Sequence, residues 1–598
     1  MKSTAQKGRA GQAADAGMIG KLMLRLLPIQ VMLAVVSSVN GIVSSYFASN
    51  HISVEAMGAV GLFSPLNMLL FAVSLMLTGG ASILCGKYMG QNARDEMQNV
   101  FSVSVAVSGL TALFFAAVFA LMGGFDLTGF LTRDEVVRPL LNRYLLGQAI
   151  GVLPLMLGNQ LAAFLFIENR TRLTFLASLA NIAVNTLMNL LFVLKLRMGA
   201  FGLALSNALG LWTFLLVQAW PFVTGASHFR FRLRGLAWGE CGQILKIGAP
   251  GALSNGYQTI RGLLVNEMIL LYVGSAGVSA FATADNVMRI FWAVPTGMVA
   301  VSRLLLSVSY GEEDRQTLTD VMRVMFTRFL PLQGLICAGI ILCAEPFTRL
   351  FFQDPTAPVY EMTAWGLRIL PICMPLSIIA MHFTALGQIT GRKVLVHGLA
   401  LLDGVVCVAG YTALLIRWMG MNSAYVANIL NGLTTTLFIV AFAWWVGKRF
   451  PRSMDALMSF PAGFGAKPED RMDLTVRDLD QVVSVARRVQ EFCLSRGVDP
   501  RRANLSGLAM EEMAGNVVEH GFTKDKKRHA IDLRVTVKDS DVILRIKDDC
   551  VPFDPGTRLE LAEGEDPIRN VGIRLVFRMA RDVEYQNILG MNVLTVRI

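Results

Sequence analysis

Charged residues are scarce in this chain: Asp, Glu, Lys and Arg make up 16% of its 598 residues, against roughly 25% in an ordinary globular protein. The shortage lies in the first three quarters of the sequence, which excludes a wholly soluble protein. A Walker A pattern, GxxxxGK(S/T), is also missing, which argues against a P-loop pump. The eight cysteines form no CxxC or Cys–His spacing, so the sequence predicts neither a disulfide framework nor a structural zinc site.

The net charge of +11 has an ordinary explanation in such a chain. Loops on the cytoplasmic side of a membrane protein are enriched in Lys and Arg, so the excess does not indicate nucleic-acid binding. Residues 1–20 are polar and lack the apolar core of a signal peptide, and we expect them to form a cytoplasmic tail.

Long apolar runs fill the sequence up to residue 447. A membrane-spanning helix needs roughly 20 apolar residues, and twelve runs qualify: 26–47, 58–84, 99–122, 144–167, 174–195, 200–222, 247–272, 278–306, 325–344, 364–387, 395–417 and 423–446. Successive loops are alternately rich and poor in Lys and Arg. This pattern predicts a multi-pass protein of the cell membrane with both termini in the cytoplasm.

The twelve runs form two repeats of six spans each. Shifting the first half by 222 positions (250 − 28) superimposes Pro28 on Pro250, Tyr88 on Tyr310 and Arg170 on Arg392. Six spans per half make the two repeats parallel, a transporter architecture with its site between the lobes. The predicted fold is therefore an all-α polytopic membrane domain followed by a soluble domain, with these parts: tail 1–20, N-lobe 21–225, linker 226–246, C-lobe 247–447, linker 448–470 and ATP-binding domain 471–598.

Several motifs of residues 20–447 resemble one transporter family. PIQVML with EAMGAVGL in the first lobe, GAPGALSN opening the second, and the paired endings MGAFGLALSN and MGMNSAYVAN are similar to the multidrug and toxic compound extrusion (MATE) transporters. The resemblance implies an antiporter that exports a cationic or amphipathic organic compound while H⁺ or Na⁺ enters. It also shows departures, because Ser44, Asn189 and Gln258 stand where many members carry acids.

Ionisable residues at membrane depth are therefore candidates for coupling, since charge there is costly and faces a cavity or a partner. These residues are concentrated in the second lobe, and the residues at the corresponding positions of the first lobe are neutral. The candidate transport and coupling residues are Glu267, Asp285, Asp403, His382 and Gln258. Two structural alternatives stay open: Asp285 can be neutralised by Arg289 one turn away, and His382 can be an interior histidine with satisfied hydrogen bonds.

The sequence changes character after residue 471. Alternating strands and amphipathic helices there predict an α/β two-layer sandwich. Glu512, Asn516 and His520 are spaced by four and share one helix face. An Asn oxygen suits Mg²⁺ and a nearby Glu can act as a general base. Asp548 ends a strand and is placed to accept a hydrogen bond from the amino group of an adenine. Gly572 opens a helix whose free N–H groups suit a phosphate.

The ordered set ExxxNxxxH, DDxxPFDP and GIRLV resembles the histidine-kinase-like (Bergerat) ATPases, in the branch of anti-sigma-factor serine kinases. The resemblance implies ATP and Mg²⁺ as ligands, with Glu512 as catalytic base, Asn516 as Mg²⁺ ligand and Asp548 as adenine reader. Cys550 and Asn570 replace glycines of the family, which predicts retained binding and weakened catalysis.

Three functions remain open at this stage. The first is an ion-gradient-coupled antiporter in the lipid bilayer, regulated by its ATP-binding domain. The second is a membrane-tethered serine/threonine kinase or partner-switching protein, with weak kinase or ATPase activity, a cytoplasmic protein partner and the transporter part as sensor. The third is a flippase for a lipid-linked substrate.

Overall fold

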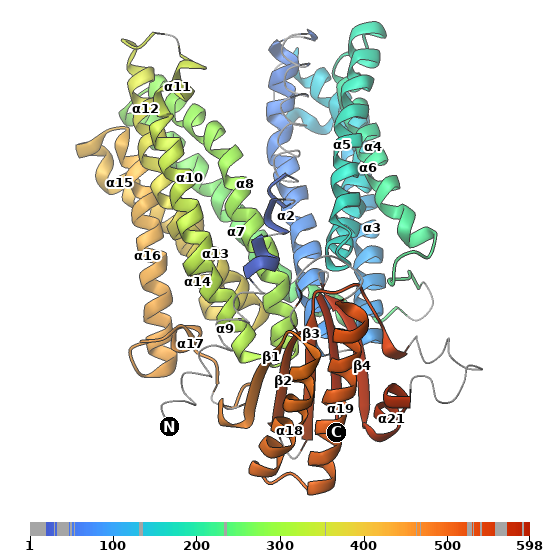
Figure 1. Ribbon diagram of the computed structural model, residues 1–598. Coiled ribbons are helices and arrows are strands. Elements are labelled where there is room, and N and C mark those ends of the chain that lie inside the picture. The colour runs from blue at the N-terminus through green and yellow to red at the C-terminus, as the bar shows by residue number, and fades with distance from the viewer. Residues whose placement is uncertain are drawn as a thin grey trace.

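A computed structural model describes residues 20–32 apart from 25 and 29, residues 43, 47, 51 and 52, and then 54–598 with short gaps. The gaps are 92, 131–134, 233–235, 353, 462, 467, 523–528, 530, 539–540, 557–570 and 589–590. A large helical part is followed by a smaller domain that packs against one end of it (Figure 1).

The first lobe is a bundle of long apolar helices. They are α2 (Val54–Gly90), α3 (Arg94–Gly124), α4 (Val137–Ile167), α5 (Thr171–Asn189) and α6 (Gly199–Val223), with a π-helical extension η2 (Leu190–Lys195) after α5 and a 3-10 turn η1 (Leu127–Phe130). Pairs α4–α6 and α3–α4 pack most extensively. The predicted first span, 26–47, lies mostly outside the described residues.

The second lobe follows the same plan with more interruptions. Its helices are α7 (Gly239–Tyr272), α8 (Ser275–Gly311), α9 (Arg315–Val324), α10 (Leu330–Leu342), α11 (Ala344–Arg349), α12 (Pro358–Ile369), α13 (Cys373–Ile389), α14 (Lys393–Leu401), α15 (Cys407–Met419) and α16 (Asn422–Gly447). The π turns η3 (Met325–Phe329) and η5 (Leu402–Val406) and the 3-10 turn η4 (Leu370–Ile372) join helix pairs within single spans.

Ten helical stretches of the described chain are long and apolar enough to cross a membrane. They match ten of the twelve predicted spans. Of the other two, the first falls largely outside the described residues, and the seventh is helix α7, which is 34 residues long but more polar. Arg261 and Glu267 lie within this helix and lower its hydropathy.

Backbone details repeat at the spacing found in the sequence. Asn169 (φ 59°) and Gly391 (φ 70°) are both left-handed, as are Gly199 (φ 58°) and Gly420 (φ 53°). These pairs are separated by 222 and 221 residues, within one residue of the shift found in the sequence. The two lobes are therefore parallel structural repeats.

The C-terminal domain is a two-layer α/β sandwich, as predicted. Five antiparallel strands form a sheet of order β1-β2-β3-β5-β4, namely β1 (Arg471–Val476), β2 (Ile531–Lys538), β3 (Asp541–Asp548), β4 (Asp582–Ile588) and β5 (Met591–Arg597). Helices α18 (Leu479–Ser495), α19 (Pro500–Asn516) and α21 (Val571–Met579) share a hydrophobic core with one face of the sheet. The π turn η7 (Val517–Gly521) extends α19.

Strand β5 is buried on both faces. Leu594 and Val596 belong to the domain's own core, whereas Met591 and Val593 belong to a core cluster that includes α8, α9 and α13 of the helical part. Side chains alternate along a strand, so the second face of the sheet is an interface with the helical part.

Candidate functional site

The predicted nucleotide-site residues converge at one edge of the C-terminal domain. Glu512 lies near the end of α19, and Gly572 lies in the first turn of α21. A Cβ atom at Gly572 would lie 1.7 Å from Glu512 Oε2, so only glycine allows this carboxylate against the start of the helix. The expected helix start at Gly572 is thus present, and the free N–H groups of such a start suit an anion.

Asn516 and His520 follow Glu512 on the same helical segment. Asn516 Nδ2 donates to the Glu512 carbonyl oxygen at 2.7 Å, which leaves the side-chain oxygen for a ligand of the kind Mg²⁺ prefers. His520 lies in the π turn η7 and is exposed. Such wide turns are frequent at functional sites.

Asp548 is buried at the end of β3 and belongs to a hydrogen-bonded network. Its Oδ1 accepts from Asn592 Nδ2 at 2.7 Å and from the Cys550 N–H at 3.0 Å. Burial raises the pKa of Asp548, although its hydrogen bonds with Asn592 and with the backbone and side chain of Cys550 act in the opposite direction.

Two members of this network were not predicted as site residues. Tyr585 donates to Asn592 Oδ1 at 2.7 Å and accepts from the Phe553 N–H at 3.1 Å. Burial raises the pKa of Tyr585 to about 12, so its hydroxyl stays protonated at neutral pH. The pairing of Asp548 with Asn592 across β3 and β5 positions this network, and only strand register could have revealed it.

Asp403 is the candidate coupling residue with the most developed surroundings. It lies in the π turn η5, and Asn431 Nδ2 donates to its Oδ1 at 2.7 Å. Arg261 of α7 donates to the backbone oxygen of Asp403 at 3.2 Å and makes no ion pair with its carboxylate in the described structure. The repeat-related residues of the first lobe, Asn181 and Gly210, carry no charge; a Cβ atom added at Gly210 would meet Asn181 Oδ1, so these two positions also lie close together.

The other predicted transport residues lie apart from Asp403. Asp285 is half-exposed and pairs with Arg289 at 3.0 Å, so the predicted neutralising pair is present. Glu267 lines a hollow of about 350 Å³ together with Leu263, Asn266, Leu270, Val278 and Ser279. Gln258 is exposed on α7. Among the described residues, these acids do not gather into one group of ligand atoms.

His382 is a poor ligand in this structure. Its side chain is completely buried, Nδ1 lies 2.8 Å from the Ile378 carbonyl oxygen, and Nε2 lies 2.8 Å from Ser302 Oγ. Both ring nitrogens therefore have protein partners, which agrees with the alternative of a satisfied interior histidine.

Buried amides of the first lobe were overlooked as possible oxygen ligands. Asn189 Nδ2 donates to Asn185 Oδ1 at 3.0 Å, but among the described residues Asn189 Oδ1 has no partner although the residue is fully buried. An orphaned buried oxygen can bind a cation or an unseen water. Ser44, the other first-lobe position noted in the sequence, lies outside the described residues.

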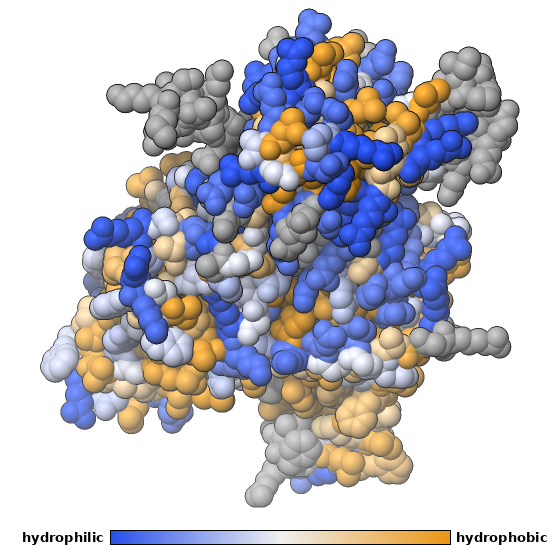
Figure 2. All heavy atoms as spheres, turned by 90° about the horizontal axis from the view of Figure 1, so that it is seen from below, coloured by the Kyte–Doolittle hydropathy of each residue, from blue (hydrophilic) through white to orange (hydrophobic). Residues whose placement is uncertain are grey.

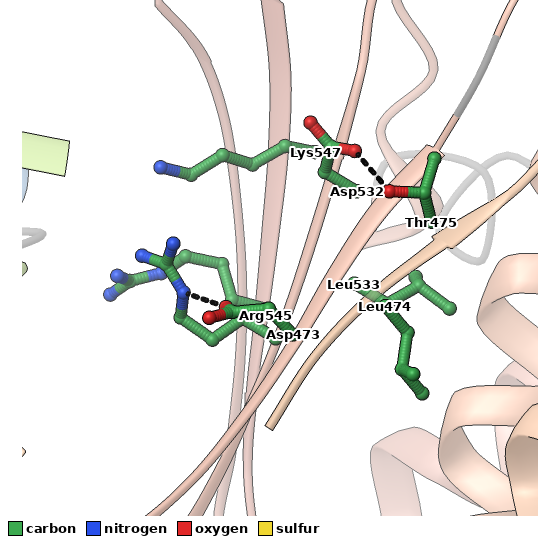
Figure 3. A pocket seen from close by; sticks show the side chains of 8 residues that line it. Asp473, Leu474, Thr475, Asp532, Leu533, Arg545 and Lys547 are labelled. Carbon is green, nitrogen blue, oxygen red and sulfur yellow. Dashed lines mark hydrogen bonds and ion pairs between the residues drawn. The ribbon is translucent and has the colours of Figure 1, made fainter. Parts of the chain in front are cut away.

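The contact between the two parts of the chain is a buried ion network. The acidic loop, defined as Glu312, Glu313 and Asp314 between α8 and α9, meets the basic sheet face, defined as Arg534, Lys538, Arg545 and Lys547. Arg534 pairs with Asp314, Arg545 lies 3.3 Å from Glu312, and Lys547 lies 3.6 Å from Asp314. Figure 3 shows Arg545 and Lys547 on one side of the sheet and Leu474 and Leu533 on the other.

Asp314 is the centre of this network. Its side chain is 2% exposed, and it also caps α9 by accepting from the Thr317 N–H at 3.0 Å. Burial alone would raise the pKa of Asp314, but the surrounding cations Arg534, Lys547, Arg471 and Arg545 hold it well below its usual range. The carboxylate is therefore charged in the docked state.

The segment that joins the two parts is also fixed to the second lobe. Arg315 makes a bidentate pair with Asp455 at 2.6 and 2.7 Å, and Arg392 donates to the carbonyl oxygens of Met458 and Ser459. The first lobe contributes Arg94, which donates to the Tyr585 carbonyl oxygen at 3.0 Å. The C-terminal domain thus contacts both lobes. Hydrophilic residues cover much of this end of the molecule (Figure 2).

Sequence families match both parts of the chain. The family MatE matches residues 28–191 and 250–397, and the histidine kinase-like ATPase domain family matches residues 475–598. A probable multidrug resistance protein NorM of Halalkalibacterium halodurans is 23% identical over 56% of this chain and 73% of its own length. The protein of the same name from Neisseria meningitidis is 22% identical over 71% of this chain and 93% of its own length.

Solved structures show the same fold in the helical part. One is the outward-facing conformation of a multidrug resistance MATE family transporter, with a TM-score of 0.66 and 20% identity over 74% of this chain and 97% of that one. Another is a MOP superfamily transporter from Pyrococcus furiosus, whose description notes a reversed polarity of the binding pocket. Its TM-score is 0.64 with 20% identity, covering 70% of this chain and 95% of that one.

Proposed function

Because the chain belongs to the MatE family of multidrug efflux transporters, we propose that it is an ion-gradient-coupled antiporter whose C-terminal domain regulates export by binding Mg·ATP. The substrate class proposed is a cationic or amphipathic organic compound, and the coupling ion is H⁺ or Na⁺. The observation that carries the regulatory part is the buried ion network between the acidic loop and the basic sheet face.

The proposed orientation places both termini and the C-terminal domain in the cytoplasm. In this arrangement the lobes are in backbone contact near that domain. A Cβ atom at Gly248 would lie 1.9 Å from the Met76 carbonyl oxygen, and one at Gly311 would lie 2.0 Å from that of Lys87. Such close approach of α2 to α7 and α8 supports a conformation closed on the cytoplasmic side. Alternating access then requires these helices to separate.

The nucleotide end of the C-terminal domain is linked to the interface through the sheet. Asp548 ends the same strand, β3, that presents Arg545 and Lys547 to the acidic loop. A nucleotide that reorders the end of β3 can therefore shift the basic sheet face against the second lobe. Such a shift is a route by which ATP occupancy biases the lobes.

Asp548→Ala is expected to weaken Mg·ATP binding about 10- to 100-fold, because hydrogen bonds to a charged group contribute about 1.5–3 kcal/mol. Isothermal titration calorimetry of the full chain in detergent measures the change. Since the pKa of Asp548 is raised, it protonates at a higher pH than an ordinary aspartate, and ATP affinity should fall as the pH is lowered through that range.

The matched control is Asp541→Asn at the other end of β3, where the side chain is 43% exposed and pairs with Arg502 and Arg581. This variant should bind Mg·ATP like the parent. Equal affinity of the Asp548→Ala chain and the parent for Mg·ATP, in a folded protein, would show that Asp548 does not read the base.

Transport is expected to follow the ion gradient and to survive loss of hydrolysis. Glu512→Ala should leave gradient-driven uptake of a cationic dye into proteoliposomes unchanged, because Glu512 lies in the C-terminal domain and contacts α21, far along the chain from the lobes. The control is the same vesicle without a gradient, with and without Mg·ATP. Complete loss of transport in a Glu512→Ala chain that still folds and binds ATP contradicts secondary transport.

The alternative of a tethered kinase predicts a different outcome. A kinase would transfer the γ-phosphoryl group to a serine or threonine of a protein partner, and Glu512→Ala would abolish that transfer. The docked sheet face is occupied by the acidic loop, so a partner would bind elsewhere on the domain. Dye transport that is indifferent to every ion gradient favours this alternative or the flippase.

A further inference from the structure

Three potential metal ligands meet beside the Asp548 network. His529 precedes β2, and Asp549 and Cys550 follow β3. The ligand atoms of these residues all lie within 4.8 Å of one another, and they form the one such group of three in the part of the chain that the structure describes. The spacing of about 20 residues hides the cluster from a search for short cysteine and histidine motifs.

Strand register explains why these residues meet. Strands β2 and β3 are antiparallel and pair Asp532 with Lys547. Continuing this register by three residues in each direction brings His529 opposite Cys550. The hairpin therefore holds an imidazole and a thiol from two strands at one end of the sheet, with the carboxylate of Asp549 beside them.

The surroundings suit a bound ion. The side chain of His529 is 1% exposed, and its Nδ1 lies 2.7 Å from Asp549 Oδ1, which orients the ring toward the carboxylate. Cys550 is buried, and a Cβ atom at Gly521 would lie 3.1 Å from its sulfur, so glycine keeps space open at the thiol. Ligand atoms on a tetrahedral zinc ion are about 3.3–3.8 Å apart, so ion binding widens the 2.7 Å His529–Asp549 contact and brings the other pairs, all within 4.8 Å, to this spacing.

We propose that His529, Asp549 and Cys550 bind a divalent ion of the zinc class. Nitrogen, oxygen and sulfur donors in one site match the preference of Zn²⁺ and exclude Mg²⁺ and Ca²⁺, which take oxygen ligands. Binding replaces the thiol proton, which is released to solvent, and leaves the fourth position of the ion to water. The three ligands do not include Asn516, where the Mg²⁺ position is predicted.

Titration of the full-length chain in detergent with Co²⁺ tests the proposal, because cobalt reports both a tetrahedral site and a bound thiolate by absorption. The expected result is one Co²⁺ per chain with a sulfur-to-cobalt band that Zn²⁺ displaces. Cys550→Ser should remove that band, and His529→Gln should weaken binding about tenfold or more. The control Cys343→Ser changes an exposed cysteine of the second lobe and should leave the spectrum unchanged.

Two results would overturn the site. One is a parent chain that binds no Co²⁺ or Zn²⁺ at micromolar concentration. The other is a thiolate band that persists in Cys550→Ser, which would assign it to another cysteine. If Cys550→Ser does not fold, His529→Gln decides alone, because undiminished cobalt affinity in that chain excludes the imidazole as a ligand.

Discussion

Asp314→Arg is expected to release the C-terminal domain from the second lobe and to abolish any effect of Mg·ATP on transport. Asp314 is buried between Arg534 and Lys547, and removing one partner of a buried ion pair costs roughly 3–5 kcal/mol. A further positive charge at this position adds repulsion from the basic sheet face. Proteoliposome transport with and without Mg·ATP, together with protease sensitivity of the joining segment, measures both effects.

The matched control is Glu313→Gln in the same acidic loop. Glu313 pairs with Lys538 but its side chain is 53% exposed, and an exposed pair contributes at most about 1 kcal/mol. This variant should remain docked. Transport by Asp314→Arg that still responds to Mg·ATP like the parent would show that regulation does not pass through the acidic loop.

The pH dependence of docking follows from the depressed pKa of Asp314. A carboxyl whose pKa is lowered in the docked state contributes its full stabilisation above its ordinary pKa of about 4. That contribution is lost only as the pH falls below this value, toward the lowered pKa. Docking should therefore be constant from neutral to mildly acidic pH.

Asp403→Asn is expected to uncouple export from the ion gradient, lowering gradient-driven transport by about tenfold or more while substrate binding remains measurable. The carboxylate of Asp403 accepts from Asn431, and no cation neutralises it among the residues that the structure describes. A carboxylate can bind a proton or supply the negative charge that balances a bound sodium ion, and the amide of the variant can do neither. Dye transport at pH 6 to 8 under imposed H⁺ and Na⁺ gradients measures the loss.

Asp285→Asn provides a matched control within the membrane part, because Asp285 is already paired with Arg289 and half-exposed. Glu267→Gln tests in parallel the second acid that makes no ion pair with the described residues. If Asp403→Asn and Glu267→Gln both transport like the parent across this pH range, coupling does not depend on second-lobe acids. The orphaned oxygen of Asn189 in the first lobe is then the next candidate.

The helical part was predictable because the bilayer imposes a simple rule. Each span needs a long apolar run, so ten helices could be found from composition alone, and the repeat supplied their grouping. The C-terminal sandwich was predictable from periodicity, and residues such as Glu512 and Gly572 could be paired by motif order. Their actual contact depends on the packing of α19 against α21.

The interface between the acidic loop and the basic sheet face could not be predicted from the sequence. Arg534 and Arg545 alternate with apolar residues along their strands, a pattern typical of a face in water. Their partners lie more than 200 residues earlier in a short loop, where acidic residues are ordinary. Likewise, the bonds of His382 to Ile378 and Ser302 depend on helix packing, so a buried histidine alone could not be told from a ligand.

The contact of Arg94 with Tyr585 attaches the C-terminal domain to the first lobe, and the contact of Asp314 with Arg534 attaches it to the second lobe. Thermodynamic reciprocity then applies. If ATP changes the balance between the lobe arrangements by some factor, drug or ion occupancy must change ATP affinity by that same factor. Under the proposed regulation, the coupling between the C-terminal domain and the lobes acts in both directions, and a nucleotide titration with and without substrate would report the state of the transport cycle.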